Sequence, residues 1–278
     1  MVVVLLMLGS GAAAGLFGSL LGLGGGILIV PILTFGFDLP LREAVGVSLV
    51  CVIVTSGAAA GVYLERGVAN LRLGMVLELF TAIGALVGGL IAFLLDERIL
   101  AGLFAVLLFY VAVTMGRARA RAAAPAESSE APTDPDVPSA ASSGLADRVS
   151  EPGYRVRALV PGATGSIGAG VISALLGIGG GAVLVPIMHI MMGVPLRVAT
   201  ATSNLMIGVT ATASAVIYVL RGGIDPFVAG PTAIGVFLGA TLGSRISHRI
   251  DLRVLRVLFV VVLVYTAIQM IRRALGLA

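Results

Sequence analysis

Two glycine clusters carry the strongest chemical signal in the sequence. Each is followed five residues later by a proline, and together they comprise Gly24, Gly25, Gly26, Gly179, Gly180 and Gly181. Glycine costs a helix about 1 kcal/mol relative to alanine, so such a break persists in a membrane where it is buried in protein or lines a wet cavity. Free N–H groups and the positive dipole end of the following helix favour an anion. The clusters predict a small-anion site, with close helix packing through small residues as the alternative.

Hydroxyl and amide side chains form a second candidate group, near the start of the long helix that follows each glycine cluster. Its members are Ser48, Thr202, Ser203 and Asn204. Such side chains can replace the hydration shell of an oxyanion without a fixed positive charge, so we expect them to bind the substrate. Hydrogen bonds between helices, or back to the helix's own carbonyl groups, are the alternative role.

Two ionisable side chains lie within apolar segments, where such groups are functional candidates by default. Glu78 is a candidate proton-relay carboxylate, and the alternative is that it snorkels to the interface or pairs with an arginine. His189 can titrate near neutral pH, and the alternative is a structural histidine. These two residues are the predicted candidates for proton coupling.

The cysteine and histidine content argues against a metal site or an enzyme active site. The chain has one cysteine, Cys51, and two histidines that are not spaced as H-x-x-x-H. Neither a disulfide within the chain nor a cysteine-based metal site can form. We therefore expect no cofactor, no metal and no enzyme activity. The net charge of +4 comes from arginine alone, which predicts a basic membrane protein rather than a nucleic-acid-binding one.

The elements that position these groups are predicted to be membrane helices. Only 12% of residues are charged and 58% are hydrophobic, whereas a soluble domain has about a quarter charged residues. Apolar segments long enough to span a bilayer lie at 2–21, 43–64, 73–95, 99–116, 156–176, 198–220, 227–247 and 254–271. Two shorter runs, 27–37 and 182–193, predict half-helices after the glycine clusters. The expected fold class is an all-α polytopic membrane protein.

The sequence repeats itself at a constant offset of 155 residues. Positions 22–115 match positions 177–270 without a gap, and the match includes both glycine clusters. Such duplication in an apolar chain is typical of a transporter whose site lies between two repeats. We predict two homologous transmembrane repeats of four segments, 1–116 and 155–278, each with a glycine-broken or re-entrant first helix.

A polar segment separates the two predicted repeats. Residues 117–154 are rich in alanine, serine, proline and acidic residues, which predicts a disordered linker. With the linker in the cytoplasm, re-entrant hairpins at the glycine clusters make the repeats inverted and place more of the arginines on the cytoplasmic side. We therefore favour inverted repeats, with parallel repeats as the alternative.

Tyrosines near the ends of equivalent helices are the expected interfacial anchors, because the chain has no tryptophan. They are Tyr63, Tyr110, Tyr218 and Tyr265. Their predicted role is structural.

The paired motifs resemble those of the TauE/SafE sulfite exporter family, also called the toluene sulfonate uptake permease family. The resemblance rests on Gly-x-Gly-Gly-Gly-x4-Pro at 22–31 and 177–186, and on Ala-x-Gly-x-Ser and Ala-x-Ala-Thr-Ser at 44–48 and 199–203. It implies transport of sulfite, sulfonates, sulfoacetate or related small sulfur-containing anions across the bacterial inner membrane. The expected partners are this substrate, the lipid bilayer and a second copy of the chain in a homodimer.

These features together predict an exporter of small oxyanions or organosulfonates that works by alternating access around the two glycine breaks. A passive anion channel is the alternative within the transport class, and an integral membrane enzyme is the alternative from another class. Counterflow of labelled substrate distinguishes a carrier from a channel. Consumption of substrate without translocation would indicate an enzyme.

Overall fold

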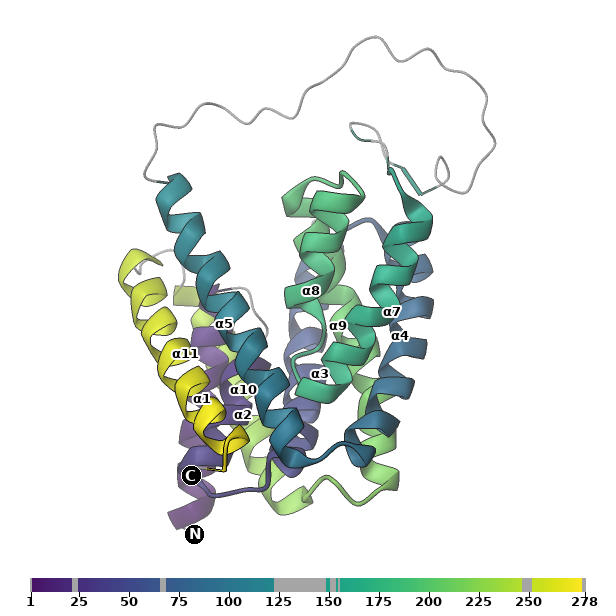
Figure 1. Ribbon diagram of the computed structural model, residues 1–278. Helices are drawn as coiled ribbons and strands as arrows, with labels where there is room; N and C mark the ends of the chain where they lie inside the picture. The colour runs from purple at the N-terminus through teal and green to yellow at the C-terminus, as the bar shows by residue number, and fades with distance from the viewer. Residues whose placement is uncertain are drawn as a thin grey trace, which may run out of the picture.

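The computed structural model describes residues 2–21, 25–65, 69–122, 149–150, 154, 156–246 and 252–276. These residues form helices and contain no β-strand, which confirms the all-α prediction (Figure 1). The helices of the first half are α1 (Val2–Leu21), α2 (Gly26–Gly36), α3 (Leu41–Glu65), α4 (Leu71–Leu94) and α5 (Glu97–Ala122). Those of the second half are α7 (Leu159–Leu176), α8 (Gly181–Pro186), the π-helix η1 (Ile187–Met191), α9 (Leu196–Leu220), α10 (Pro226–Ile246) and α11 (Leu252–Ala274).

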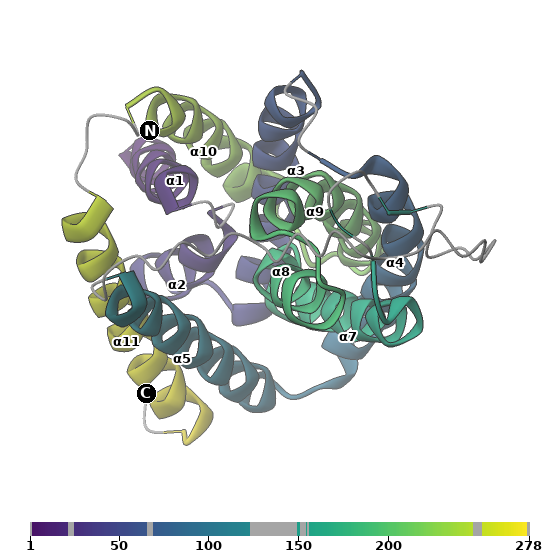
Figure 2. The same ribbon diagram turned by 90° about the horizontal axis from the view of Figure 1, so that it is seen from above.

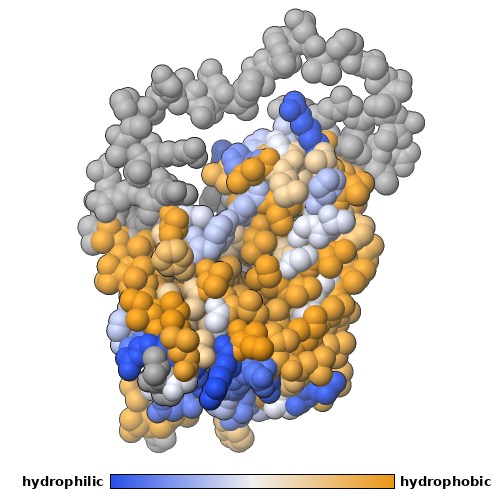
Figure 3. All heavy atoms as spheres, in the orientation of Figure 1, coloured by the Kyte–Doolittle hydropathy of each residue, from blue (hydrophilic) through white to orange (hydrophobic). Residues whose placement is uncertain are grey.

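Seven of the described helices are long and apolar enough to cross a membrane, namely α1, α4, α5, α7, α9, α10 and α11. The segment α2 and the continuous segment of α8 and η1 are apolar but short, as predicted for half-helices. Figure 3 shows hydrophobic residues covering the side of the bundle on the face drawn, with hydrophilic residues gathered towards its two ends. The chain is therefore a membrane protein with two short helices among its spans.

Each half begins with a long helix and a short helix that runs back. In Figure 1, α1 begins and α2 ends at the lower end of the bundle, where both chain ends are marked. By contrast, α7 begins and η1 ends at the upper end. The two breaks therefore lie inside the bundle, approached from opposite ends. Gly24, with the rest of 22–24, lies outside the described residues.

The first helix of each half packs against a helix of the other half. Helix α1 packs along α10, and α7 packs along α4. Glycines permit this close approach, because a Cβ at Gly239 would overlap the carbonyl oxygen of Ala12, and one at Gly84 would overlap that of Ile167. Small residues at such crossings let membrane helices pack backbone against backbone. Gly84 and Gly239 are equivalent positions of the repeated sequence, so both crossings use the same device.

Helices α3 and α9 lie in the middle of the molecule. They pack against each other, and α3 also contacts α10 while α9 contacts α4. Figure 2 shows them between the α1–α10 pair and the α4–α7 pair. Helices α5 and α11 form a separate pair at the margin, where Glu97 and Arg273 approach to 3.7 Å. The central position of α3 and α9 brings their buried faces against the two glycine breaks.

Helix α5 is longer than the sequence predicts. It continues to Ala122, into the predicted linker, because the alternating alanines and arginines of 117–122 are strong helix formers. The remainder of the predicted linker, from 123 to 148, lies outside the described residues.

Tyr218 does not have the predicted interfacial role. Its side chain is fully buried, its hydroxyl donates a 3.1 Å hydrogen bond to the carbonyl oxygen of Ala174, and its ring lies 5.1 Å from that of Phe93. Tyr110 and Tyr265 are exposed, as interfacial anchors must be. The side chain of Tyr63 lies outside the described part of the chain. Position near a helix end was therefore insufficient to predict exposure.

Candidate functional site

The two short helices begin after glycines that share an unusual backbone conformation. Gly25 precedes α2 with a φ of 76°, and Gly180 precedes α8 with a φ of 79°. Residues with a side chain rarely adopt this left-handed conformation, so the turn itself requires glycine at both positions. The first N–H groups of each short helix have no partner within the helix and are available to other acceptors.

The structure brings the two breaks into contact at Ser48. This residue is fully buried on α3, and its hydroxyl lies 3.2 Å from the carbonyl oxygen of Gly26 and 2.7 Å from that of Gly177. A Cβ added to Gly26 would lie 2.8 Å from the same oxygen of Gly177, so the backbones of the two breaks touch. Ser48 therefore bridges the first half and the second half at the centre of the molecule.

Two further hydroxyl groups lie beside the second break without a hydrogen-bond partner among the described residues. Ser203 is 1% exposed, and a Cβ added to Gly181 would lie 3.4 Å from its Oγ. Ser173 is also 1% exposed, and a Cβ added to Gly180 would lie 3.6 Å from its Oγ. Since buried hydroxyls nearly always have a partner, two unpartnered ones at a single helix start indicate a place for an acceptor from outside the chain.

The groups around the second break suit a small oxyanion. Both the hydroxyls and the N–H groups at a helix start can donate hydrogen bonds, and none of them carries a full charge. Apolar side chains limit the space, because a Cβ at Gly179 would meet Val52 and Ile207. The arrangement can bind an anion through hydrogen bonds without holding it so tightly that it fails to leave.

Two of the predicted polar residues accept hydrogen bonds from outside the breaks, Thr202 through its side chain and Asn204 through its backbone. The Oγ1 of Thr202 accepts a 3.0 Å hydrogen bond from the N–H of Asn70, just before α4. The carbonyl oxygen of Asn204 accepts a 2.7 Å hydrogen bond from the hydroxyl of Ser56 on α3. Successive side chains on a helix point about 100° apart, which explains why Ser203 faces the break while Thr202 faces the start of α4. The alternative stated for this group, contact between helices, describes Thr202.

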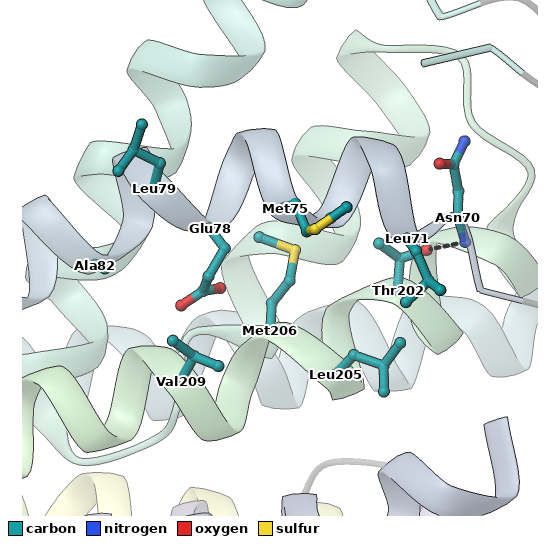
Figure 4. A pocket seen from close by; sticks show the side chains of 11 residues that line it. Asn70, Leu71, Met75, Glu78, Leu79, Ala82, Thr202, Leu205, Met206 and Val209 are labelled. Carbon is teal, nitrogen blue, oxygen red and sulfur yellow. Dashed lines mark hydrogen bonds between the residues drawn. The ribbon is translucent and has the colours of Figure 1, made fainter. Parts of the chain in front are cut away.

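Glu78 lies on α4 beside a cavity of about 450 Å³ between α4 and α9 (Figure 4). Its Oε1 accepts a 2.8 Å hydrogen bond from the hydroxyl of Thr210, on α9. Its Oε2 is buried and has no hydrogen-bond partner among the described residues. Glu78 therefore does not pair with an arginine of the described chain, and one of its oxygens remains for another ligand.

His189 has different surroundings. It lies in η1 and is exposed, and its Nδ1 is 2.9 Å from the carbonyl oxygen of Val194. The residue at the equivalent position of the first half is Thr34. The two predicted proton-coupling residues are thus unequal, because Glu78 is partly buried between α4 and α9 and His189 is exposed.

Ser173 is the residue of this site that the sequence analysis did not select. The repeat offered no signal for it, because the equivalent position of the first half is Gly18. Its place four residues before Gly177, one turn from the break, is the feature that could have identified it.

Comparison with known proteins places the chain among membrane transporters. The family model for Sulfite exporter TauE/SafE matches residues 7–270. The probable membrane transporter protein YunE of Bacillus subtilis is 27% identical, over 97% of each chain. A probable membrane transporter protein of Methanocaldococcus jannaschii is 28% identical, over 89% of this chain and 88% of the relative. One of Xylella fastidiosa is 26% identical, over 98% and 96%. No solved structure matches significantly.

Proposed function

The chain belongs to the TauE/SafE sulfite exporter family and is a membrane transporter, and we propose that it carries small sulfur-containing anions such as sulfite, sulfonates or sulfoacetate. The observation that carries this proposal is a pair of buried hydroxyls beside the start of α8, Ser173 and Ser203, which have no hydrogen-bond partner among the described residues. The proposed direction is export across the bacterial inner membrane, with residues 117–154 on the cytoplasmic side.

The chemistry of a sulfite or sulfonate group suits these donors. Such a group presents three oxygen acceptors on one sulfur, and the hydroxyls of Ser173 and Ser203 can each donate to one of them. The N–H groups that follow Gly180 can donate to the third. In this proposal Gly25 and Gly26 supply the matching backbone of the first break, with Ser48 holding it against the second.

The proposed mechanism is alternating access between two inverted repeats. Three observations support it. The helix pairs α1–α2 and α7–η1 enter from opposite ends of the bundle (Figure 1). Equivalent short and long helices begin at positions 155 apart, as at Gly26 and Gly181. The first helix of each half also packs against the other half, since α1 packs on α10 and α7 packs on α4. A movement of one bundle against the other would expose the contact between the breaks to either side.

Labelled sulfite flux into liposomes that contain the full chain tests this function. Preloaded unlabelled sulfite is expected to accelerate uptake of the label, which a carrier shows and a channel does not. The double variant Ser173→Ala, Ser203→Ala should lower sulfite affinity about tenfold or more, because each hydroxyl contributes about 1 kcal/mol. Matched controls are Thr164→Val on α7 and Thr200→Val on α9, whose hydroxyls donate to their own helices.

The outcomes separate the possible functions. Competition by sulfonates and sulfoacetate would define the range of substrates. Flux without counterflow would identify a channel, and sulfite consumption without flux would identify an enzyme. Wild-type affinity in the double serine variant would show that the anion binds elsewhere.

A further inference from the structure

The cavity between α4 and α9 contains an acid in the middle of a membrane span. Glu78 is the one acidic residue so placed in the described helices, since the others lie in first or last turns or in loops. The walls of the cavity are mostly apolar and include Met75, Leu79, Leu205, Met206 and Val209. Figure 4 shows the Glu78 carboxyl group extending from α4 toward α9 between these side chains. An ionisable group is costly in such surroundings, so its presence indicates a function.

The hydrogen bonds of the cavity leave one acceptor unmatched. Thr210 donates to Oε1 of Glu78, while Oε2 is buried without a partner among the described residues. The other polar groups of the cavity are bonded elsewhere, because Thr202 accepts from the backbone of Asn70 and the side-chain amide of Asn70 donates to Val149 and Tyr154. A single proton on Oε2 is the smallest ligand that this acceptor can take.

No other charge faces this carboxyl group from the helices packed against α4. Helix α7 has no charged or titratable side chain along 159–176. Helix α9 has Arg197, which is exposed in its first turn, and Tyr218, which is buried near its last turn. On α4 itself, Arg72 is exposed in the first turn. Among the described residues of these helices, no neighbouring fixed charge therefore sets the protonation of Glu78.

We propose that Glu78 binds the coupling proton, an inference that rests on the proposed anion transport. In this scheme α9 couples the protonation of Glu78 to anion binding beside Ser203. Thr210 follows Ser203 by two turns of α9, or about 10 Å along the helix. If the Glu78 carboxylate and an anion beside Ser203 are separated by this distance, their repulsion at an effective dielectric constant of about 20 changes the binding equilibrium on the order of tenfold. The anion thus binds best while Glu78 holds its proton, and the two cross the membrane in the same direction.

Thr210 is a positioning residue in this scheme. When the Glu78 carboxyl gives its proton to water, the Thr210 hydroxyl is the donor that stabilises the carboxylate and holds α9 against α4. When the carboxyl takes a proton from water, it can donate a hydrogen bond itself, and this hold on α9 weakens. Because Ser203 lies on the same helix, the movement of α9 also changes the second glycine break.

Sulfite counterflow and proton movement, measured in the same liposomes with a trapped pH indicator, test the proposal. Wild-type protein is expected to move protons with sulfite. A proton gradient in the direction of the sulfite flux should accelerate net flux about tenfold. Glu78→Gln should retain counterflow within about threefold, as expected when binding persists and coupling is lost, and should show no proton movement. Glu43→Gln, which alters an acid in the first turn of α3, should behave like wild type.

Each outcome decides between the two proposals. Proton movement that persists in Glu78→Gln overturns the inference, as does stimulation by a sodium gradient in place of the proton gradient. Net sulfite flux without proton movement in the wild type also overturns it, while leaving the proposed function intact. Absence of counterflow in the wild type overturns the proposed function instead.

The infrared carbonyl band of a protonated carboxyl group tests the proton site without any substrate. In the purified full-length protein, the part of this band that Glu78→Gln removes should titrate with pH, and Glu43→Gln should leave that part in place. Thr210→Val should change the pH at which the band titrates. Thr210→Ser should leave this pH as in wild type, because serine retains the donor hydroxyl. An identical band in wild type and Glu78→Gln overturns the inference whatever the substrate is.

Discussion

Thr55 and Thr210 occupy equivalent positions in the two halves of the chain, but their hydrogen bonds differ. Thr55 donates to carbonyl oxygens of its own helix, at Cys51 and Val52. Thr210 donates across to Glu78, whose equivalent position in the second half is Ala233. The repeated sequence thus provides similar helices twice, whereas the ionisable side chain between them occurs once.

Ser48 and Ser203 show the same contrast at the glycine breaks. Ser48 donates to carbonyl oxygens of both breaks, and Ser203 has no partner among the described residues. Ser48 therefore holds the two breaks together, while the Ser203 hydroxyl remains a donor without a partner among the described residues. The comparison teaches that equivalent residues build the scaffold of this transporter in both halves, and that its chemistry depends on where their contacts differ.

The shared helix crossings should respond equally to the same change in either half. Gly84→Ala directs a methyl group at the carbonyl oxygen of Ile167, and Gly239→Ala directs one at that of Ala12. Each should lower the free energy of unfolding by about 3 kcal/mol, because the backbone cannot yield without separating the helices. Thermal unfolding of the purified protein in detergent measures both losses.

Controls for the crossings lie on the same bundles. Gly230 on α10 and Gly168 on α7 have no atom within 4 Å of an added Cβ. Their replacement by alanine should change stability by less than about 1 kcal/mol, in the stabilising direction. A large loss for Gly84→Ala with none for Gly239→Ala would show that the crossings are not equivalent.

Equivalent glycines at the breaks should respond unequally. A Cβ at Gly26 would lie 2.8 Å from the backbone oxygen of Gly177, whereas one at Gly181 would lie 2.5 Å from Cδ1 of Ile207, the end of a flexible side chain. Gly26→Ala should cost about 2 kcal/mol of stability and Gly181→Ala less than about 1 kcal/mol. Adding Ile207→Val, which removes the Cδ1 methyl, should restore the stability of Gly181→Ala but not that of Gly26→Ala. Equal losses would contradict the inferred asymmetry.

The two serines should separate stability from substrate binding. Ser48→Ala should cost about 1.5 kcal/mol of stability, because it removes the hydroxyl donor shared by the buried carbonyl oxygens of Gly26 and Gly177. Ser203→Ala breaks no hydrogen bond seen among the described residues, so stability should stay within about 0.5 kcal/mol while sulfite affinity falls several-fold. Thermal unfolding measures the stability of both variants, and calorimetric titration with sulfite measures their affinity in the same preparations. Reversed effects would mean that Ser203 supports the fold and Ser48 contacts the anion.

The smallest expected difference in stability is between the two threonines. The hydrogen bonds that Thr55 donates to Cys51 and Val52 lie within its own helix, and their loss in Thr55→Val should change stability by less than about 0.5 kcal/mol. Thr210→Val removes a bond between helices and should cost about 1 kcal/mol. The ratio of net flux at two pH values is the sharper measure, because it should change for Thr210→Val and not for Thr55→Val. Equal pH responses would remove Thr210 from the coupling scheme.

Much of the fold follows from the sequence, because apolar length and glycine breaks depend on local physics. The helices α2 and α9 were predicted close to their observed bounds, and Glu78 stood out as a charge within an apolar run. Side-chain direction was harder to predict. Thr202 and Ser203 are neighbours in the sequence, yet they face different helices, which depends on the rotation of α9 within the bundle. Ser173 was missed because its role arises from a contact with Gly180 rather than from the repeat.

The exchange of first helices between the halves has a consequence for biosynthesis. Helix α1 leaves the ribosome well before α10, the helix on which it packs, because α2 to α9 are made between them. Its glycine face must therefore remain without its native partner during most of translation, and neither half can complete its packing alone. Assembly is thus a property of the whole chain, so two separately produced halves should mature only when they meet in the same membrane.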